Sequence, residues 1–204
     1  MATGTEKRFP AEQVIIRQGD EDEHVYLLLS GLVKVTALDA DQETFLAIRV
    51  GGDVIGEMAA LEKRPRSASV VTSVPTEARV IQRAELQAFI EQCPDGAIEL
   101  MRMMSERLRW SNSRRIDLTT RSATARVSRI LYEIARIYGR EVPAGWDLGV
   151  PLTQAELASL AGVARRTAEK VLHDLSQRRL VSPGYRRLVI TDVQGLRAEA
   201  EASP

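Results

Sequence analysis

The stretch 51–70, GGDVIGEMAALEKRPRSASV, carries residues whose types and spacing suit the binding of one phosphate group. Its glycines, Gly56 among them, allow backbone conformations that a side chain forbids and let the main chain approach a ligand closely. Residues 57–61 are expected to form one helical turn, whose first N–H groups lack internal partners and suit an anion. Arg66 adds a guanidinium that can hold two phosphate oxygens at once.

A carboxylate also belongs to this stretch, since Glu57 follows Gly56 directly. Glu57 would repel an adjacent phosphate, and it is better suited to accept a hydrogen bond from a sugar hydroxyl alongside. A glycine, a glutamate and a later arginine also occur in an ordinary β-turn with a surface arginine. The residue types alone therefore leave both interpretations open.

The order of these residues is more specific than their types. The string G-E-x-A-x-L-x-x-x-P-R-S-A, which begins at Gly56, resembles the phosphate-binding cassette of cyclic-nucleotide-binding domains. The resemblance implies that Gly56, Glu57 and the short helix bind ribose and phosphate, and that Arg66 binds the phosphate. Met58 and Ser67 complete the ligand-binding residues expected here, and the Ser67 hydroxyl could also contact a guanine.

The length and the charge of the chain limit the possible domain organisation. The 204 residues suffice for one large or two small domains. Basic and acidic residues are equal at 28 each, but residues 1–118 carry a net charge of −4 and residues 119–204 a net charge of +4. This asymmetry indicates that the second half contacts nucleic acid or another acidic surface.

Several classes of protein and site are disfavoured. No apolar run approaches the roughly 18 residues of a membrane span, and the N-terminus lacks the apolar core of a signal peptide. The single cysteine, Cys93, cannot form an internal disulfide, so a cytoplasmic protein is expected. His24 and His173 have no Cys or His neighbour, so no metal, haem or iron–sulfur site is expected.

The first part of the chain has the pattern of a β-sandwich or small barrel. Short runs rich in Val, Ile, Leu and Thr alternate with turn residues. Lys34 and Thr36 alternate with apolar neighbours, which predicts a strand with one buried face. The expected strands are 13–17, 25–29, 32–38, 43–50, 68–73 and 76–81. A short helix at 84–92 should close the barrel.

A longer helix is expected from about 95 to 117, with a seam whose members are spaced by three and four residues. The seam contains Met101, Met104, Leu108, Ser111, Arg115 and Leu118. One interpretation packs this helix on its own barrel, with Ser111 and Arg115 at the surface. The favoured interpretation is a parallel dimer helix whose polar stretch meets a ligand, because the cassette needs a lid.

The pattern changes after Leu118. Thr119 and Thr120 are expected to cap a new helix at 122–138, followed by a connection at 139–151. Thr153 is expected to cap a helix at 154–160, a turn at 161–163 contains Gly162, and a second helix covers 164–177. This is the pattern of a helix-turn-helix.

Charged residues lie near the start of the second helix of this motif, where a recognition helix meets base edges. Two-stranded pairing around a turn at 182–184 should form a wing whose arginines contact phosphates. Such helix pairs are also found in purely structural roles, but the arginines and the local charge favour DNA binding. The expected DNA-binding residues are Thr153, Arg165, Arg166, Thr167, Glu169, Lys170, Arg186 and Arg187.

The barrel, long helix and winged helix-turn-helix, in this order, resemble the cAMP receptor protein/FNR (CRP/FNR) family of bacterial transcription regulators. The resemblance implies an α+β fold with a cyclic-nucleotide-binding jelly-roll barrel at 1–94, a dimerisation helix at 95–118 and a winged helix-turn-helix domain at 119–204. It also implies a homodimer. Ser111 and Asn112 align with a Thr-Ser pair that touches the adenine of cAMP, so the base preference of this chain is open.

The sequence leaves three hypotheses about function. The leading hypothesis is a dimeric regulator of a near-palindromic operator, controlled by cAMP or cGMP without a metal, and contacting RNA polymerase if it activates. The second is a constitutive regulator with a degenerate pocket. The third is an enzyme acting on cyclic nucleotides, for which no Ser/His/Asp set or metal ligands are seen. The family often begins its recognition helix Arg-Glu-Thr, and Arg166 at the glutamate position predicts a different half-site.

Overall fold

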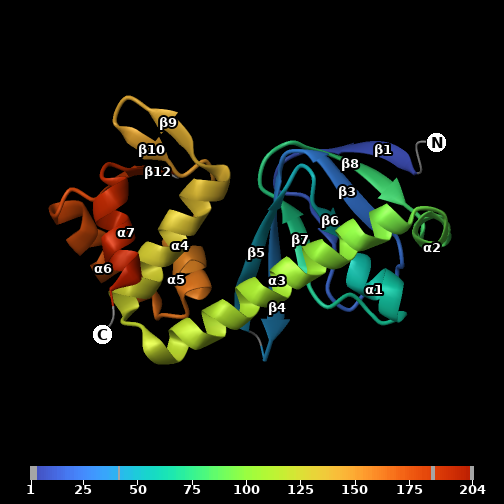
Figure 1. The fold of residues 1–204 in the computed structure, drawn as a ribbon, viewed down its shortest axis with the longest axis horizontal. Helices are drawn as coiled ribbons and strands as arrows, with labels where there is room; N and C mark the ends of the chain where they lie inside the picture. The colour runs from blue at the N-terminus through green and yellow to red at the C-terminus, as the bar shows by residue number, and fades with distance from the viewer. Residues whose placement is uncertain (1–3, 41, 185–186, 203–204) are drawn as a thin grey trace. The chain divides into compact units, whose positions relative to one another are not determined.

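The computed structural model describes residues 4–40, 42–184 and 187–202. The chain forms two compact units, residues 1–107 and 108–204. Helix α3 (Pro94–Thr120) continues through the boundary between them (Figure 1). The sequence predicts this boundary after residue 118. It lies earlier because the part of α3 after Arg107 bonds to other helices of the second unit.

The first unit consists of two antiparallel four-stranded sheets, in the orders β1-β8-β3-β6 and β2-β7-β4-β5. Its strands are β1 (Thr5–Phe9), β2 (Val14–Ile16), β3 (Val25–Ser30), β4 (Leu32–Asp39), β5 (Gln42–Val50), β6 (Val54–Ile55), β7 (Ser69–Thr72) and β8 (Thr76–Ile81). Helix α1 (Glu57–Glu62) follows β6, and α2 (Arg83–Gln92) follows β8. The antiparallel β fold expected for this part of the chain is confirmed.

Side chains from both sheets form the core of the first unit. Phe9 and Leu28 from one sheet join Ile16, Val33 and Val70 from the other in a single buried cluster. Alternation along each strand directs these side chains inward and leaves the polar ones on the outer faces. The core therefore supports β6 and α1, which carry the phosphate-binding stretch.

Two strands of the first unit have no clear signal in the sequence. Strand β1 reads TEKRF and is mostly exposed, because it lies at the edge of its sheet, where charged residues are common. Strand β6 has two residues, too few for any periodicity. Pairing with β8 and β3, respectively, determines both strands.

The second unit contains the expected helix-turn-helix, which is confirmed. Thr153 caps α5 (Gln154–Ala161) in a capping box, and Gly162 turns the chain at a φ of 60° into α6 (Arg165–Gln177). Helix α4 (Ala123–Tyr138) packs against α7 (Val193–Glu201), a helix that no sequence pattern predicted.

The expected cap of α4 is wrong. Thr119 and Thr120 end α3, and their hydroxyls donate to the Ile116 carbonyl. Ser122 caps α4 instead, and its Oγ accepts a hydrogen bond from Ala125 N at 3.2 Å. Because α3 extends through Thr120, both threonines lie inside that helix, and Ser122 occupies the N-cap position of α4.

The connection at 139–151 and the wing also differ from expectation. The connection contains the hairpin β9 (Arg140–Val142) and β10 (Gly145–Asp147), and β10 pairs with β12 (Arg187–Ile190). The wing therefore belongs to a four-stranded sheet of order β11-β12-β10-β9. The expected turn at 182–184 lies inside β11 (Val181–Gly184), where an edge strand tolerates a proline.

Candidate functional site: an anion-binding cassette and a DNA-binding face

Gly56 shapes the phosphate-binding stretch. It has a φ of 80° and immediately precedes α1. A Cβ atom at this position would lie 2.5 Å from Arg66 Nη1, so glycine permits both the turn and the close approach of Arg66. No described side chain caps α1, whose first N–H groups have no partner within the helix. These donors and the guanidinium fit the phosphate of a nucleotide.

Arg66 is part of the fold as well as of the cassette, since only 3% of its surface is exposed. Its Nε donates to Asp22 Oδ1 at 2.5 Å, its Nη1 to the Gly56 carbonyl at 2.7 Å and its Nη2 to the His24 carbonyl at 2.5 Å. A guanidinium has five N–H groups, so one on Nη1 and one on Nη2 remain for a phosphate.

Glu57 is buried, with 6% exposed, and it is held by the long helix. Its Oε1 accepts a hydrogen bond from Arg107 Nη1 at 2.7 Å. Arg107 Nη2 also donates to the Val54 carbonyl at 2.6 Å and lies 3.4 Å from Asp53 Oδ1. A buried carboxylate needs such a partner, and its remaining lone pairs can accept from a hydroxyl.

The other expected ligand residues lie in two places. Met58 and Ser67 are exposed beside α1, with Ser67 Oγ 3.9 Å from Met58 Sδ. Ser111 and Asn112 are exposed on the part of α3 that belongs to the second unit. Their meeting with the cassette stays a prediction.

A polar cluster adjoins Arg66 in the first unit. Tyr26 OH donates to the Ile15 carbonyl at 3.0 Å and lies 2.7 Å from His24 Nε2, while His24 Nδ1 lies 3.3 Å from Asp22 Oδ2. Burial lowers the pKa of His24, and Arg66 lowers it further, against the opposing effect of Asp22. His24 is therefore mainly neutral at pH 7.

Apolar side chains of the expected dimer seam are exposed on α3. Exposure is 58% for Met101, 37% for Met104 and 62% for Leu108. Ser111 and Arg115, further along the seam, are exposed as well. Exposed apolar side chains repeated along one helix are typical of a surface that a partner covers.

The recognition helix α6 presents basic residues to solvent. Arg165 and Glu169, four residues apart on this helix, form an ion pair of 2.9 Å. Arg166 and Lys170 are exposed and form no ion pair with any described residue, and Thr167 is half-buried. Thr153 donates and accepts within the capping box of α5.

Arg187 of β12 is paired with a carboxylate of the neighbouring hairpin. Its Nε donates to Asp147 Oδ2, and Asp147 Oδ1 accepts from Gly149 N at 2.8 Å. Burial alone would raise the pKa of Asp147, but the hydrogen bonds from Gly149 and Arg187 hold it below its ordinary value. Arg186, the other expected phosphate contact of the wing, lies outside the described residues.

Metal-binding, thiol and membrane-spanning features were also sought among the described residues. The described ranges hold no group of three or more His, Cys, Asp or Glu side chains arranged to bind a metal ion. Cys93 is a half-buried free thiol. Among the helices that the structure describes, none is both long enough and apolar enough to cross a bilayer.

Comparison with known proteins decides the family. The cyclic nucleotide-binding domain family matches residues 6–93, and the Crp-like helix-turn-helix domain family matches residues 125–199. The cyclic AMP receptor protein of Thermus thermophilus is 33% identical over 180 residues, which cover 86% of this chain and 79% of that protein. The chain belongs to the CRP/FNR family.

Further relatives agree with this membership. A CRP-like cAMP-activated global transcriptional regulator of Mycobacterium tuberculosis is 28% identical over 193 residues, covering 94% of this chain and 86% of that protein. A crystal structure of a CRP/FNR-family regulator from Thermus thermophilus shares the fold, with a TM-score of 0.83 and 23% identity over 98% of this chain and 100% of that one.

Membership of the CRP/FNR family makes this chain a DNA-binding transcription regulator with a cyclic nucleotide-binding domain. Regulators of this family are not enzymes. Sequence reasoning missed Arg107, which pairs with Glu57 of the cassette. Its position one helical turn before Ser111 was the available signal, because residues four apart share a helix face.

Proposed function

We propose that this CRP/FNR regulator is a homodimer whose affinity for DNA is set by a cyclic nucleotide, cAMP or cGMP. The Glu57–Arg107 pair carries this proposal, since it links the cassette to the long helix. Any group that bonds to Glu57 competes or cooperates with Arg107, and so acts on α3. Such control requires tighter binding of the nucleotide to the DNA-competent state than to the other.

The roles of the cassette residues follow from their chemistry. The free N–H groups of Arg66 and of the first turn of α1 suit a phosphate, and Glu57 suits a ribose hydroxyl. A bound cyclic nucleotide would supply this hydroxyl, the phosphate and a base edge. Ser111 and Asn112 are proposed to meet the base, and their hydroxyl and amide accept either purine. We favour cAMP because the relatives from Thermus and Mycobacterium are named for it.

The dimer is proposed to form along the exposed seam of α3, with Met101, Met104, Leu108, Ser111 and Arg115. Two-fold symmetry then requires a near-palindromic operator with half-sites about 34 Å apart. Base edges are read from α6, by Arg165, Arg166, Thr167, Glu169 and Lys170. Thr153, Arg186 and Arg187 contact phosphates, and an activator of this design also contacts RNA polymerase.

One observation favours a second candidate function, a constitutive regulator. The guanidinium of Arg66 is paired with Asp22 and bonded to two backbone carbonyls. A cassette that is satisfied internally could be degenerate. In that case DNA affinity would be the same with and without a cyclic nucleotide.

Isothermal titration of the full chain with cAMP and with cGMP distinguishes the two candidates, together with DNA binding measured with and without each nucleotide. We expect binding of at least one nucleotide and a change in DNA affinity. Changing Ser111 and Asn112 together to alanine should lower nucleotide affinity and alter the preference between the two bases. Absence of heat with both nucleotides, with unchanged DNA affinity, would establish the constitutive regulator.

A further inference from the structure

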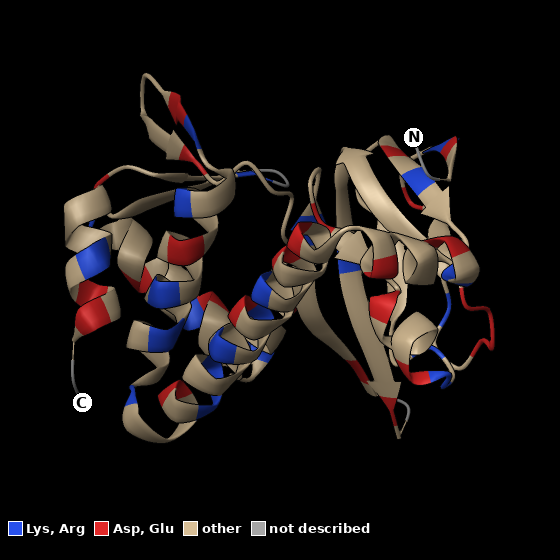
Figure 2. Ribbon diagram, turned by 45° about the vertical axis from the view of Figure 1, so that its right-hand side comes forward, with Lys and Arg blue, Asp and Glu red and all other residues tan. Residues whose placement is uncertain are grey.

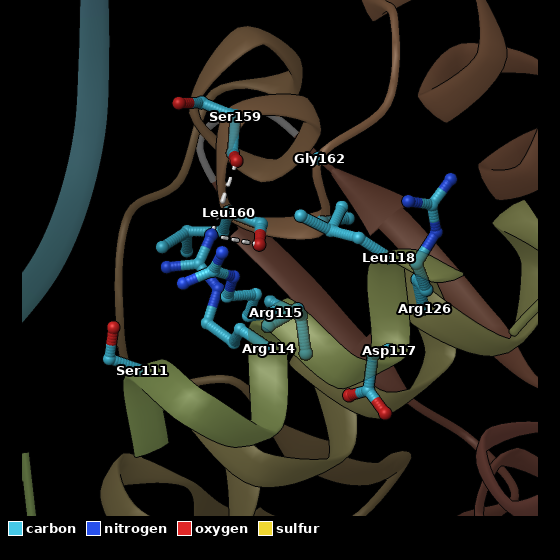
Figure 3. Close-up of a pocket in the computed structure, with 11 residues that line it drawn as sticks. Ser111, Arg114, Arg115, Asp117, Leu118, Arg126, Ser159, Leu160 and Gly162 are labelled. Atoms are coloured by element: carbon cyan, nitrogen blue, oxygen red, sulfur yellow. Dashed lines mark hydrogen bonds between the residues drawn. The ribbon is translucent and has the colours of Figure 1, made fainter. Parts of the chain in front are cut away.

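The part of α3 that belongs to the second unit is bonded to the first helix of the helix-turn-helix. Arg114 Nη2 donates to the Leu160 carbonyl and, at 3.2 Å, to the Ser159 carbonyl (Figure 3). These two residues lie in the last turn of α5, where the Ser159 carbonyl also accepts a hydrogen bond from Gly162 N at 3.2 Å. A cation at this end also complements the helix dipole, so Arg114 acts as a C-terminal cap supplied by another helix.

The guanidinium of Arg114 is fixed from its other side by an aromatic ring. It lies 4.5 Å from the centre of the Trp110 ring, one helical turn earlier on α3. Trp110 Nε1 donates to Glu133 Oε2 on α4 at 3.3 Å. Burial lowers the pKa of Arg114, against the opposing effect of Glu133. An arginine side chain nevertheless stays protonated in proteins. The arginine is thus stacked and hydrogen-bonded in one orientation.

Ion pairs continue this network to the end of α3. Glu133 Oε1 accepts from Arg129 Nε at 2.9 Å, and Arg129 Nε lies 3.3 Å from Asp117 Oδ2. Asp117 also accepts from Arg121 Nε at 2.8 Å. Basic residues follow one another along the second half of α3 and on α4 (Figure 2). The last turns of α3 are therefore bound to α4 through Trp110 and Asp117, and to α5 through Arg114.

Arg107 and Arg114 lie seven residues apart on one continuous helix, which is two turns or about 10 Å. Arg107 holds Glu57 of the cassette, and Arg114 holds the end of α5. Helix α5 leads through Gly162 directly into the recognition helix α6. Arg114 therefore joins α3 to the element that directly precedes α6.

We propose that Arg114 is the positioning residue that couples the cassette to DNA recognition, with Trp110 holding its guanidinium in place. This inference rests on the proposed function, because it requires that a nucleotide acts on α3. The residue touches neither nucleotide nor DNA in this scheme. Arg114 instead changes the coupling free energy between nucleotide binding and DNA binding, which can be measured separately from either affinity.

The test is the ratio of DNA affinities with and without saturating cAMP, measured by fluorescence anisotropy on an operator selected from a random library. Arg114→Gln should leave cAMP affinity within about twofold. The ratio should fall at least about fivefold, towards one, since coupling typically amounts to 5–150-fold. Arg109→Gln is the matched control: it removes the same charge from the same helix, and Arg109 is exposed without an ion pair to any described residue.

Each outcome is decisive. An unchanged ratio in Arg114→Gln, or an equal loss of DNA affinity in both states, would overturn the positioning role. A wild-type protein that binds neither cAMP nor cGMP, or whose DNA affinity responds to neither, refutes the proposed function itself. If Arg114→Gln does not fold, Arg114→Lys and Trp110→Phe serve instead. The lysine keeps the charge without the planar stacking, and the phenylalanine keeps the ring without the bond to Glu133, so both should give an intermediate ratio.

Discussion

Arg66→Ala should affect the stability of the first unit as well as nucleotide binding. The sequence assigns Arg66 only to the phosphate of the ligand, which predicts that its removal leaves the fold intact. In the structure its guanidinium bonds to Asp22 and to the carbonyls of Gly56 and His24. Truncation leaves these acceptors without their partner in a site where Arg66 is 3% exposed.

The expected loss can be worked out from these contacts. A buried acceptor left without a partner costs about 1–3 kcal/mol, and two carbonyls are affected. The pair with Asp22 adds little, about 1 kcal/mol or less, because the carboxylate side chain is 38% exposed. Allowing for water that enters the vacated space, we expect a loss of about 2–4 kcal/mol. This is a large part of the 5–15 kcal/mol typical of a folded protein.

Urea unfolding of the full chain without nucleotide measures this loss. Both tryptophans, Trp110 and Trp146, lie in the second unit, so their fluorescence reports on that unit alone. Hydrogen exchange of the β3 and β7 amides reports on the first unit. Arg64→Ala is the matched control, since Arg64 is exposed in the same loop and bonds to no described residue.

The reasoning predicts earlier unfolding of the first unit in Arg66→Ala, with the tryptophan signal unchanged. Arg66→Lys should recover part of the stability but little of the nucleotide affinity, because an ammonium cannot reproduce the planar fork. If Arg66→Ala and Arg64→Ala unfold alike, within about 0.5 kcal/mol, the internal bonds of Arg66 contribute no stability and the argument is refuted.

Four further predictions concern other parts of the chain. Leu108→Glu should convert the dimer to a monomer in sedimentation, because it places like charges across the seam; a persistent dimer would locate the interface elsewhere. Ser128→Ala should stabilise the second unit by about 0.5–1.5 kcal/mol in thermal unfolding, since the buried Oγ has no hydrogen-bond partner among the described residues; a lower midpoint would contradict this. Burial lowers the pKa of His24 below 6.5, so the unfolded chain binds a proton more readily than the folded chain does. The free energy of unfolding should therefore fall as the pH drops below about 6.5. In unfolding measured across pH, His24→Gln should make the free energy of unfolding less dependent on pH. Selection from a random DNA library should give different half-sites for the wild type and Arg166→Glu; identical sites would show that Arg166 reads no base.

The sequence by itself determined the elements that depend on nearby residues. Except for β1 and β6, the strands of the first unit follow from runs of β-favouring residues between turn signals, and α5 follows from the capping box that joins Thr153 and Glu156. The cassette follows from a contiguous string, since Gly56 and Arg66 are ten residues apart. These features are local, so their physical causes can be read along the chain.

Only the tertiary structure decided which charged groups meet. Arg107 finds Glu57 across 50 residues, Arg66 finds Asp22 across 44, and Arg114 finds Ser159 across 45. An arginine carries the same charge wherever it stands in the sequence, and nothing local selects among the many carboxylates and carbonyls. Burial makes the selection, because a charge removed from water must be paired where the fold places it. Strand pairing also depends on partners that are distant in the sequence. For this reason only the structure showed that β10 pairs with β12 and so joins the β9–β10 hairpin to the wing.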